Sequence, residues 1–105
     1  MELKDRALKA FWIWYLLPEQ RKTYKTDSLI GNDPAIKIRF LAMSFTERFG
    51  VYVDFFDSVG IDIEIYTTIH GFDFMIKTNI FRGYFETRAE ARATAIEKAN
   101  EIYNQ

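Results

Sequence analysis

Ile61-Asp62-Ile63-Glu64-Ile65-Tyr66-Thr67-Thr68-Ile69-His70 is the stretch that decides the fold. Isoleucine occupies every odd position of this run except position 67, and acidic or polar residues lie between them. Successive side chains of a strand point to opposite faces, so a period of two predicts a β-strand with one buried and one exposed face. We predict that the odd positions face the core and that Asp62, Glu64 and Tyr66 face away from it.

The same period continues on both sides of the isoleucine run. It predicts a strand over residues 51–56 and another over residues 74–81. Residues 57–60 and 70–73 contain the turn formers expected of hairpin connections, and Gly83 indicates a bulge or bend. Together these patterns predict a three-stranded antiparallel meander.

Two helices are predicted before the strands. Apolar residues recur at helical spacing over residues 3–17, where Pro18 is expected to end the helix, and turn-forming residues indicate a loop over 18–33. Asp33-Pro34 is expected to begin the second helix, with Asp as N-cap and Pro in the first position, and Gly50 is expected to end it. The apolar side of this second helix comprises Ile38, Leu41, Ala42, Phe45 and Phe49.

A third helix is predicted from about Arg88 to Tyr103. Thr87 and Glu90 have the spacing of a capping box, which satisfies backbone N–H groups at a helix start. The apolar side of this helix comprises Ala95, Ile96, Ala99, Ile102 and Tyr103. Helices packed on one face of an antiparallel sheet form an α+β domain, and 105 residues suffice for one such domain. We predict a single domain in which helix 3–17 and loop 18–33 precede an αβββα unit at 34–104.

Composition argues against several classes of site. The chain has no Cys and a net charge of -1, which excludes disulfides and thiolate metal sites and gives no general attraction to nucleic acid or an anionic membrane. The apolar run at 7–17 is shorter than the ~20 residues of a membrane span, and no signal-peptide cleavage site follows it. We therefore predict a cytoplasmic protein that does not bind membranes.

Residues suited to catalysis are few. His70 is the only histidine, and its position beside Gly71 is typical of a turn residue. Asp62 and Glu64 are expected to lie about 7 Å apart on one strand face, where they either solubilise the strand or act as an acid–base pair or cation site. The sequence has no P-loop, dinucleotide fingerprint or zinc spacing. We predict a protein that is not an enzyme and that binds no cofactor or metal.

The helix, three strands and helix predicted over 34–104 resemble the double-stranded RNA-binding domain. The Ala-rich run from Thr87 to Ala99 is similar to the last helix of that family, in which basic residues at the helix start bind phosphates. This resemblance places phosphate contacts at Arg88 and Arg92. Ala89 stands at the family's middle basic position, and residues 57–60 are acidic where the family has a basic loop.

The segment from Gly83 to Ala99 has a second resemblance, to the tails of small uncharacterised phage and prophage proteins. In those proteins a strand that ends in an aromatic and an acidic residue leads into a helix with this spacing. The resemblance implies a phage or mobile-element origin and brings no established activity.

One candidate interface combines the first helix with the even-numbered sheet face. The first helix is apolar nearly all round from Ala10 to Leu17, and the even face is richer in aromatic residues than a solvated face usually is. Either this helix covers that face, or a partner chain does, and a homodimer through the helix is one form of the second alternative. The candidate interface residues are Phe11, Trp12, Trp14, Tyr52, Phe56, Tyr66, Met75 and Phe81.

The other candidate surface is basic. Three basic residues surround Tyr24, and basic groups with an aromatic ring can bind a nucleic-acid backbone and stack a base, although an ordinary solvated loop has the same composition. The candidate contacts are Arg21, Lys22, Lys25, Arg88 and Arg92. Acidic residues on the even sheet face would repel phosphates there. We predict a protein-interaction or accessory module, with RNA or DNA binding as the alternative.

Overall fold

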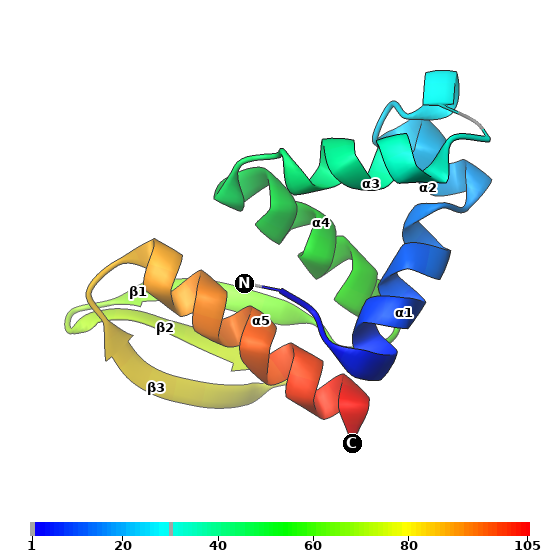
Figure 1. Cartoon of the computed structure of the whole chain (residues 1–105). Coiled ribbons are helices and arrows are strands. Elements are labelled where there is room, and N and C mark those ends of the chain that lie inside the picture. The colour runs from blue at the N-terminus through cyan, green and yellow to red at the C-terminus, as the bar shows by residue number, and fades with distance from the viewer. Residues whose placement is uncertain (1, 30) are drawn as a thin grey trace.

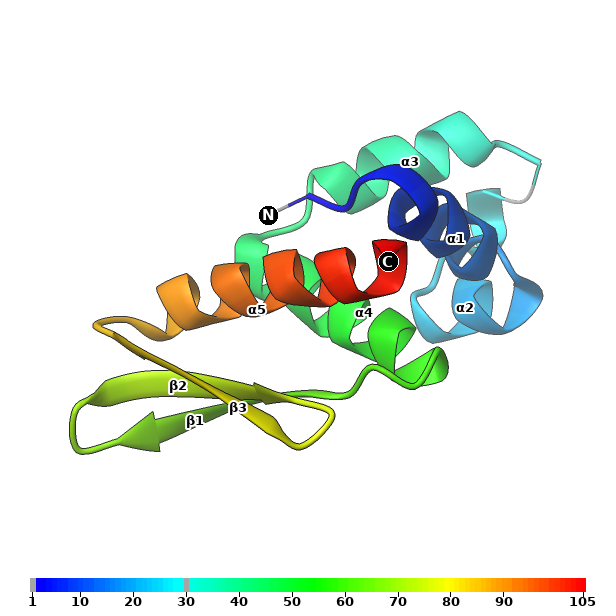
Figure 2. The same ribbon diagram turned by 90° about the horizontal axis from the view of Figure 1, so that it is seen from below.

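The computed structural model describes residues 2–29 and 31–105. Its elements, in chain order, are α1 (Asp5–Tyr15), α2 (Pro18–Thr23), the 3-10 helix η1 (Asp27–Leu29), α3 (Asp33–Leu41), α4 (Phe45–Ser58), β1 (Ile63–Thr68), β2 (Gly71–Ile76), β3 (Asn79–Phe85) and α5 (Arg88–Asn104). The antiparallel sheet has the order β1-β2-β3 and packs against α5, while α1 and α4 contact α5 from its other sides (Figures 1 and 2). The predicted α+β class is confirmed.

The isoleucine run forms β1 and the segment leading into it. Ile61 and Ile63 are buried, whereas Asp62 and Glu64 are exposed, as the alternation predicts. Ile69 is 95% exposed because it lies in the turn between β1 and β2, beyond the end of the strand. The period of two therefore identifies the buried face only as far as the strand extends.

Helix α5 agrees closely with its prediction. The Thr87 hydroxyl accepts a hydrogen bond from the Glu90 backbone N–H at 3.1 Å, which caps the helix start. Ala95 and Ala99 are completely buried, and these small side chains let the helix lie close to the strands.

The predicted strand over 51–56 is wrong, because these residues form the second half of α4. Val51, Tyr52, Phe55 and Phe56 are buried, and their spacing places them on one side of a helix. Apolar residues occupy both odd and even positions in this segment, so they fit a helical face as well as a strand. Residues 57–60 correspondingly form the end of α4 and the segment after it rather than a hairpin turn.

The single helix predicted from Asp33 to Gly50 is two helices. α3 ends at Leu41, and the Ser44 hydroxyl accepts from the Glu47 N–H at 3.2 Å to cap α4, so Gly50 lies inside α4. Asn32 rather than Asp33 is the N-cap of α3, since its side chain accepts from the Ala35 N–H. The buried residues of α3 are Ile36 and Phe40, and Ile38 and Leu41 of the predicted apolar side are exposed.

The strand predicted over 74–81 contains a hairpin turn. Lys77 and Thr78 have φ angles of 51° and 69° and connect β2 to β3. Two-residue hairpin turns of this kind usually contain Asn or Gly, so the sequence lacks the usual signal. The predicted irregularity at Gly83 is confirmed, because the register of β3 against β2 shifts between Phe85 and Phe81.

The loop predicted over 18–33 contains α2 and η1 among its described residues, and residue 30 lies outside them. α1 ends at Tyr15, and Pro18 is the first residue of α2. Proline is favoured at a first helical position, because its fixed φ suits a helix and its missing N–H would have no partner there. Pro18 therefore begins α2, whereas the sequence predicted only that it ends the first helix.

Tyr15 carries a buried phenol that has no hydrogen-bond partner among the described residues. Its side chain is 1% exposed, and its hydroxyl makes no hydrogen bond to the described residues. Burial raises the pKa of Tyr15, and the Arg39 charge partly opposes this increase. We expect Tyr15→Phe to raise the free energy of unfolding by about 1 kcal/mol, because it removes an unpaired buried hydroxyl. Urea denaturation measures this change, and a loss of stability would show that the hydroxyl has a partner in solution.

Candidate interaction surface

The predicted interface does not form one surface. Phe11, Tyr52 and Phe56 are buried in the core, where the Phe11 ring of α1 packs against Tyr52 and Phe55 of α4. α5 lies between α1 and the sheet, so α1 does not cover the even sheet face (Figures 1 and 2). Both the composite interface and the idea that α1 covers the sheet are therefore wrong.

The remaining candidate interface residues lie in different places. Trp12 and Trp14 are half-buried on α1, and Tyr66 and Met75 are half-buried on the sheet. Phe81 belongs to the α5 side of the sheet, since its ring stacks on buried Phe74 at a centroid distance of 5.0 Å. Only part of the predicted set is thus available to a partner.

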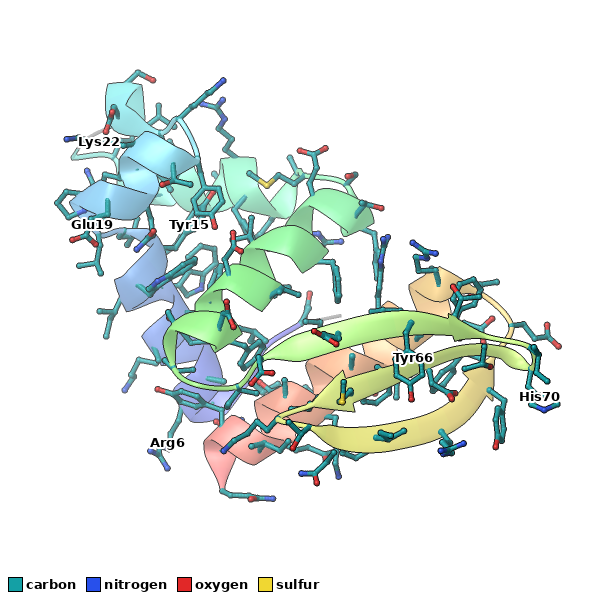
Figure 3. All side chains as sticks on the ribbon, turned by 180° about the vertical axis from the view of Figure 1, so that it is seen from behind. Arg6, Tyr15, Glu19, Lys22, Tyr66 and His70 are labelled. Atoms are coloured by element: carbon teal, nitrogen blue, oxygen red, sulfur yellow. The ribbon has the colours of Figure 1, made fainter. Side chains whose placement is uncertain are left out.

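The outer sheet face carries no catalytic arrangement among the described residues. His70 lies at the tip of the β1–β2 hairpin, where its ring packs edge-to-face on Tyr84 at 5.6 Å (Figure 3). Asp73 is buried, and its carboxylate accepts from the Tyr84 N–H at 3.0 Å, which satisfies a backbone donor at the bulge. Within residues 2–29 and 31–105, no group of three or more His, Cys, Asp or Glu residues is arranged to hold a metal ion.

The predicted basic residues lie at two ends of the molecule. Arg21, Lys22 and Lys25 belong to α2 and the segment after it, whereas Arg88 and Arg92 lie in the first turns of α5 (Figures 1 and 2). The structure therefore does not bring the five residues together into one nucleic-acid surface.

Three of these basic side chains also have partners within the protein. The Arg21 Nε donates to the Leu16 carbonyl at 2.9 Å. The Arg88 guanidinium lies over the Phe72 ring at 5.3 Å, and that of Arg92 lies over the Phe49 ring at 5.2 Å. These contacts hold the arginines against the protein surface.

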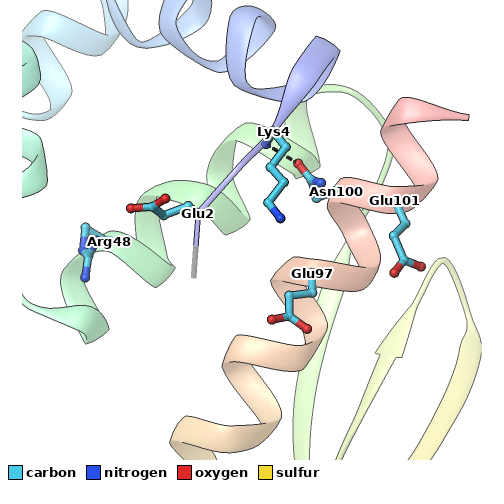
Figure 4. Close-up of a pocket in the computed structure, with 6 residues that line it drawn as sticks. All are labelled: Glu2, Lys4, Arg48, Glu97, Asn100 and Glu101. Atoms are coloured by element: carbon cyan, nitrogen blue, oxygen red, sulfur yellow. Dashed lines mark hydrogen bonds between the residues drawn. The ribbon is translucent and has the colours of Figure 1, made fainter.

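A cleft of about 690 Å³ lies between the N-terminal segment, α4 and α5 (Figure 4). Its lining residues are Glu2, Lys4, Arg48, Glu97, Asn100 and Glu101. Burial raises the pKa of neighbouring Tyr52, while the Arg48 charge lowers it and the Glu2 charge raises it. The lining therefore carries three carboxylates and two cationic side chains, whose charges largely offset one another.

A second groove, of about 470 Å³, lies beside α4. Its lining residues are Thr23, Tyr24, Lys25, Met43, Glu47, Gly50, Val51 and Asp54. The Tyr24 hydroxyl donates to Asp54 Oδ2 at 2.6 Å. Burial, followed by this hydrogen bond to a carboxylate, raises the pKa of Tyr24, so the phenol remains a neutral donor. Sequence reasoning missed this groove, because Gly50 was interpreted as a helix end.

Several large aliphatic side chains in the N-terminal half of the chain are exposed. The sequence predicted this exposure only in part. Ile13 of α1 is 65% exposed and Ile38 of α3 is 69% exposed, although the two helices are in contact through Trp12 and Phe40. Leu8, Leu17 and Leu41 are also exposed. The all-round apolar character of the first helix was the available signal for this surface.

Comparison with protein-family models, with curated proteins and with solved structures finds no match. Among the described residues, no helix combines the length and the apolar character needed to cross a membrane. The resemblances to the double-stranded RNA-binding domain and to phage proteins stay predictions.

Proposed function

We propose that this chain is a small non-enzymatic protein-interaction module that binds through the exposed aliphatic side chains of α1, of the segment between α1 and α2, and of α3. The observation that carries the proposal is the exposure of five large aliphatic side chains in the N-terminal half of a domain that already has a filled aromatic core. They are Leu8, Ile13, Leu17, Ile38 and Leu41, called here the helical apolar surface. Large aliphatic side chains that are exposed to water favour burial against another protein.

The proposal includes two broader expectations from the sequence. The chain is taken to be a cytoplasmic accessory protein of phage or mobile-element type, supported by the absence of Cys and by the character of its C-terminal segment. Self-association as a homodimer is the simplest form of binding, since a two-fold dimer buries the same apolar surface on both copies.

A photo-crosslinking residue placed at position 13 or 38 tests the proposed surface. We expect crosslinks to a protein partner, or to a second copy of the chain, from both positions. Position 69 is the matched control, because Ile69 is equally apolar and even more exposed but lies in a hairpin turn away from these helices. Equal crosslinking from all three positions, or none from 13 and 38, would contradict the proposal.

Ile13→Glu is expected to weaken the same association at least tenfold, because it places a charge where apolar surface is buried. Sedimentation of the purified protein at increasing concentration, or titration with the crosslinked partner, measures the affinity. Ile69→Glu introduces the same charge and is expected to leave the affinity unchanged. Persistence of full affinity in the Ile13→Glu protein would place the interface elsewhere.

Nucleic-acid binding has less support, because the candidate basic residues are divided between two ends of the molecule. Duplex RNA at low salt is therefore expected to give no gel shift with this protein. A shift that weakens steeply as salt increases would instead favour the nucleic-acid alternative.

A further inference from the structure

The two edges of the sheet, β1 and β3, differ in how well they are protected against pairing with another chain. The register of β3 shifts between Phe85 and Phe81, and Arg82 lies within the strand. The irregular part includes Tyr84, whose φ is 49° and whose N–H donates to buried Asp73. Bulges and charged side chains on an edge strand discourage pairing. The β3 edge is therefore poorly suited to accept another strand.

The β1 edge has little protection of this kind. It pairs with β2 in an unbroken antiparallel register that runs from Ile63 to Thr68. Its six residues include no Pro, Gly, Lys or Arg, most of them are β-branched, and Glu64 is the charged one. Within residues 2–29 and 31–105, β2 is the only strand that pairs with β1 (Figure 1). A regular edge strand of this composition is suited to pair with a further strand.

The register identifies the backbone groups that are free on this edge. The Lys77 N–H donates to the Asp62 carbonyl at 3.1 Å, so residues 62 and 77 form a hydrogen-bonded pair of the antiparallel ladder. Such pairs recur at every second residue, which directs the even-numbered backbone groups of β1 toward β2. The N–H and C=O groups of Ile63, Ile65 and Thr67 therefore point to the free edge.

We propose that the β1 edge pairs antiparallel with β1 of a second copy of this chain, so that the two sheets become one. Because only odd-numbered backbone groups are free, odd residues of one copy pair with odd residues of the other. The register centred on Ile65 places Ile65 opposite itself and Ile63 opposite Thr67. A shift by two residues in either direction leaves Ile63 or Thr67 opposite a residue outside β1, so the centred register uses all the free groups.

The charges on the outer sheet face favour the antiparallel direction. Asp62 and Glu64 are both exposed and lie at the start of β1. A parallel partner in the same register would place these carboxylates beside their own copies, where like charges repel. In the antiparallel register, Glu64 lies opposite the Tyr66 phenol and Asp62 lies opposite Thr68, so no two carboxylates face each other. Tyr66 lies on this face of the sheet (Figure 3).

The side of β1 that faces α5 gains apolar contact in the same arrangement. Exposure increases along the strand, from Ile63 at 8% to half-buried Ile65 and exposed Thr67. Two β-branched side chains directly opposite each other form a favourable cross-strand pair, so Ile65 and its copy cover each other. β1 contains none of the residues of the helical apolar surface, and the inference therefore goes beyond the proposed function.

Single-cysteine variants test the register, because the chain has no cysteine of its own. In the proposed dimer the two copies of position 65 have Cα atoms about 5.5 Å apart, which a disulfide can span. The two copies of position 67 lie roughly 14 Å apart, since each is opposite position 63. We expect Ile65→Cys to form a disulfide-linked dimer at least tenfold faster than Thr67→Cys under mild oxidation. Random collision would instead favour position 67, which is the more exposed. Equal rates, or no dimer from either variant, would overturn the proposal.

Thr67→Pro tests the pairing without a covalent link. Proline removes an N–H that points to the free edge, so the hydrogen bonds between β1 and β2 are kept. We expect Thr67→Pro to weaken dimerisation at least tenfold in sedimentation equilibrium, and Thr67→Ala, which keeps the N–H, to retain it. Undiminished dimerisation of a folded Thr67→Pro protein would overturn the proposal. Circular dichroism reports the fold, and the disulfide pattern decides alone for a variant that does not fold.

Both measurements are made in the Ile13→Glu protein, which separates this edge from the helical apolar surface. The Ile65→Cys disulfide is expected to persist in that background, and association through β1 alone ends at a dimer. Loss of crosslinks from positions 13 and 38 would overturn the proposed function and leave the β1 pairing intact. Loss of the Ile65→Cys disulfide would overturn the β1 pairing alone.

Discussion

Replacing Phe11 with alanine is expected to lower the free energy of unfolding by about 4 kcal/mol. The Phe11 ring is completely buried, and its centroid lies between 5.0 and 5.9 Å from six other aromatic rings. Those rings belong to Trp12, Trp14, Tyr15, Phe40, Tyr52 and Phe55. Removing the ring leaves a cavity that α1, α3 and α4 all line, so no single side chain can fill it.

Chemical denaturation with guanidinium chloride measures this loss. A domain of this size has a total stability of about 5–15 kcal/mol, so the variant is expected to unfold at much lower denaturant concentration. Ile13→Ala is the matched control on the same helix, since Ile13 is 65% exposed and its truncation is expected to change stability by less than about 0.5 kcal/mol. Similar effects of the two substitutions would contradict the packing of α1 described above.

The second large effect is expected where α5 caps α1. Asn100 Oδ1 accepts from the Lys4 backbone N–H at 2.9 Å, and Asn104 Oδ1 accepts from the Ala7 N–H at 2.9 Å. Asn104 Nδ2 also donates to the Lys4 carbonyl at 3.0 Å. Lys4 is the N-cap of α1 and has no capping side chain of its own. Two asparagines one turn apart on α5 thus satisfy N-cap and N3 donors that a local capping box would satisfy.

We expect the double substitution of Asn100 and Asn104 by alanine to cost about 3 kcal/mol, since each leaves helix-terminal groups without a partner. Each single substitution is expected to cost about half as much. Hydrogen exchange of the first amides of α1 should accelerate more than that of α5, because the caps hold the α1 end. Gln105→Ala is the control, and comparable destabilisation by that variant would show that the asparagine hydrogen bonds are not the cause.

The candidate surfaces could not be predicted from local sequence patterns, because they are formed by contacts between segments that are far apart in the chain. The sequence contained the basic residues of the proposed nucleic-acid contact, but their separation in space follows from the positions of α2 and α5. Gly50 follows an apolar segment with helical periodicity, and this pattern predicts a helix end. In the structure Gly50 lies inside α4, where it lines the groove beside this helix. The sequence places Ile38 on the apolar side of its helix, but Ile38 is exposed, because α3 buries Ile36 and packs Phe40 against Phe11 of α1 instead.

The local sequence by itself determined those elements whose residue pattern fits only one type of secondary structure. The isoleucine alternation of β1 fits only a strand, and the capping box with its alanine-rich face fits only the helix α5. Residues 51–56 include apolar residues at both odd and even positions, so their pattern fits a strand and a helix equally well. Tertiary packing decided between them, since Phe11 contacts both Tyr52 and Phe55, and two residues three apart share a face in a helix but not in a strand.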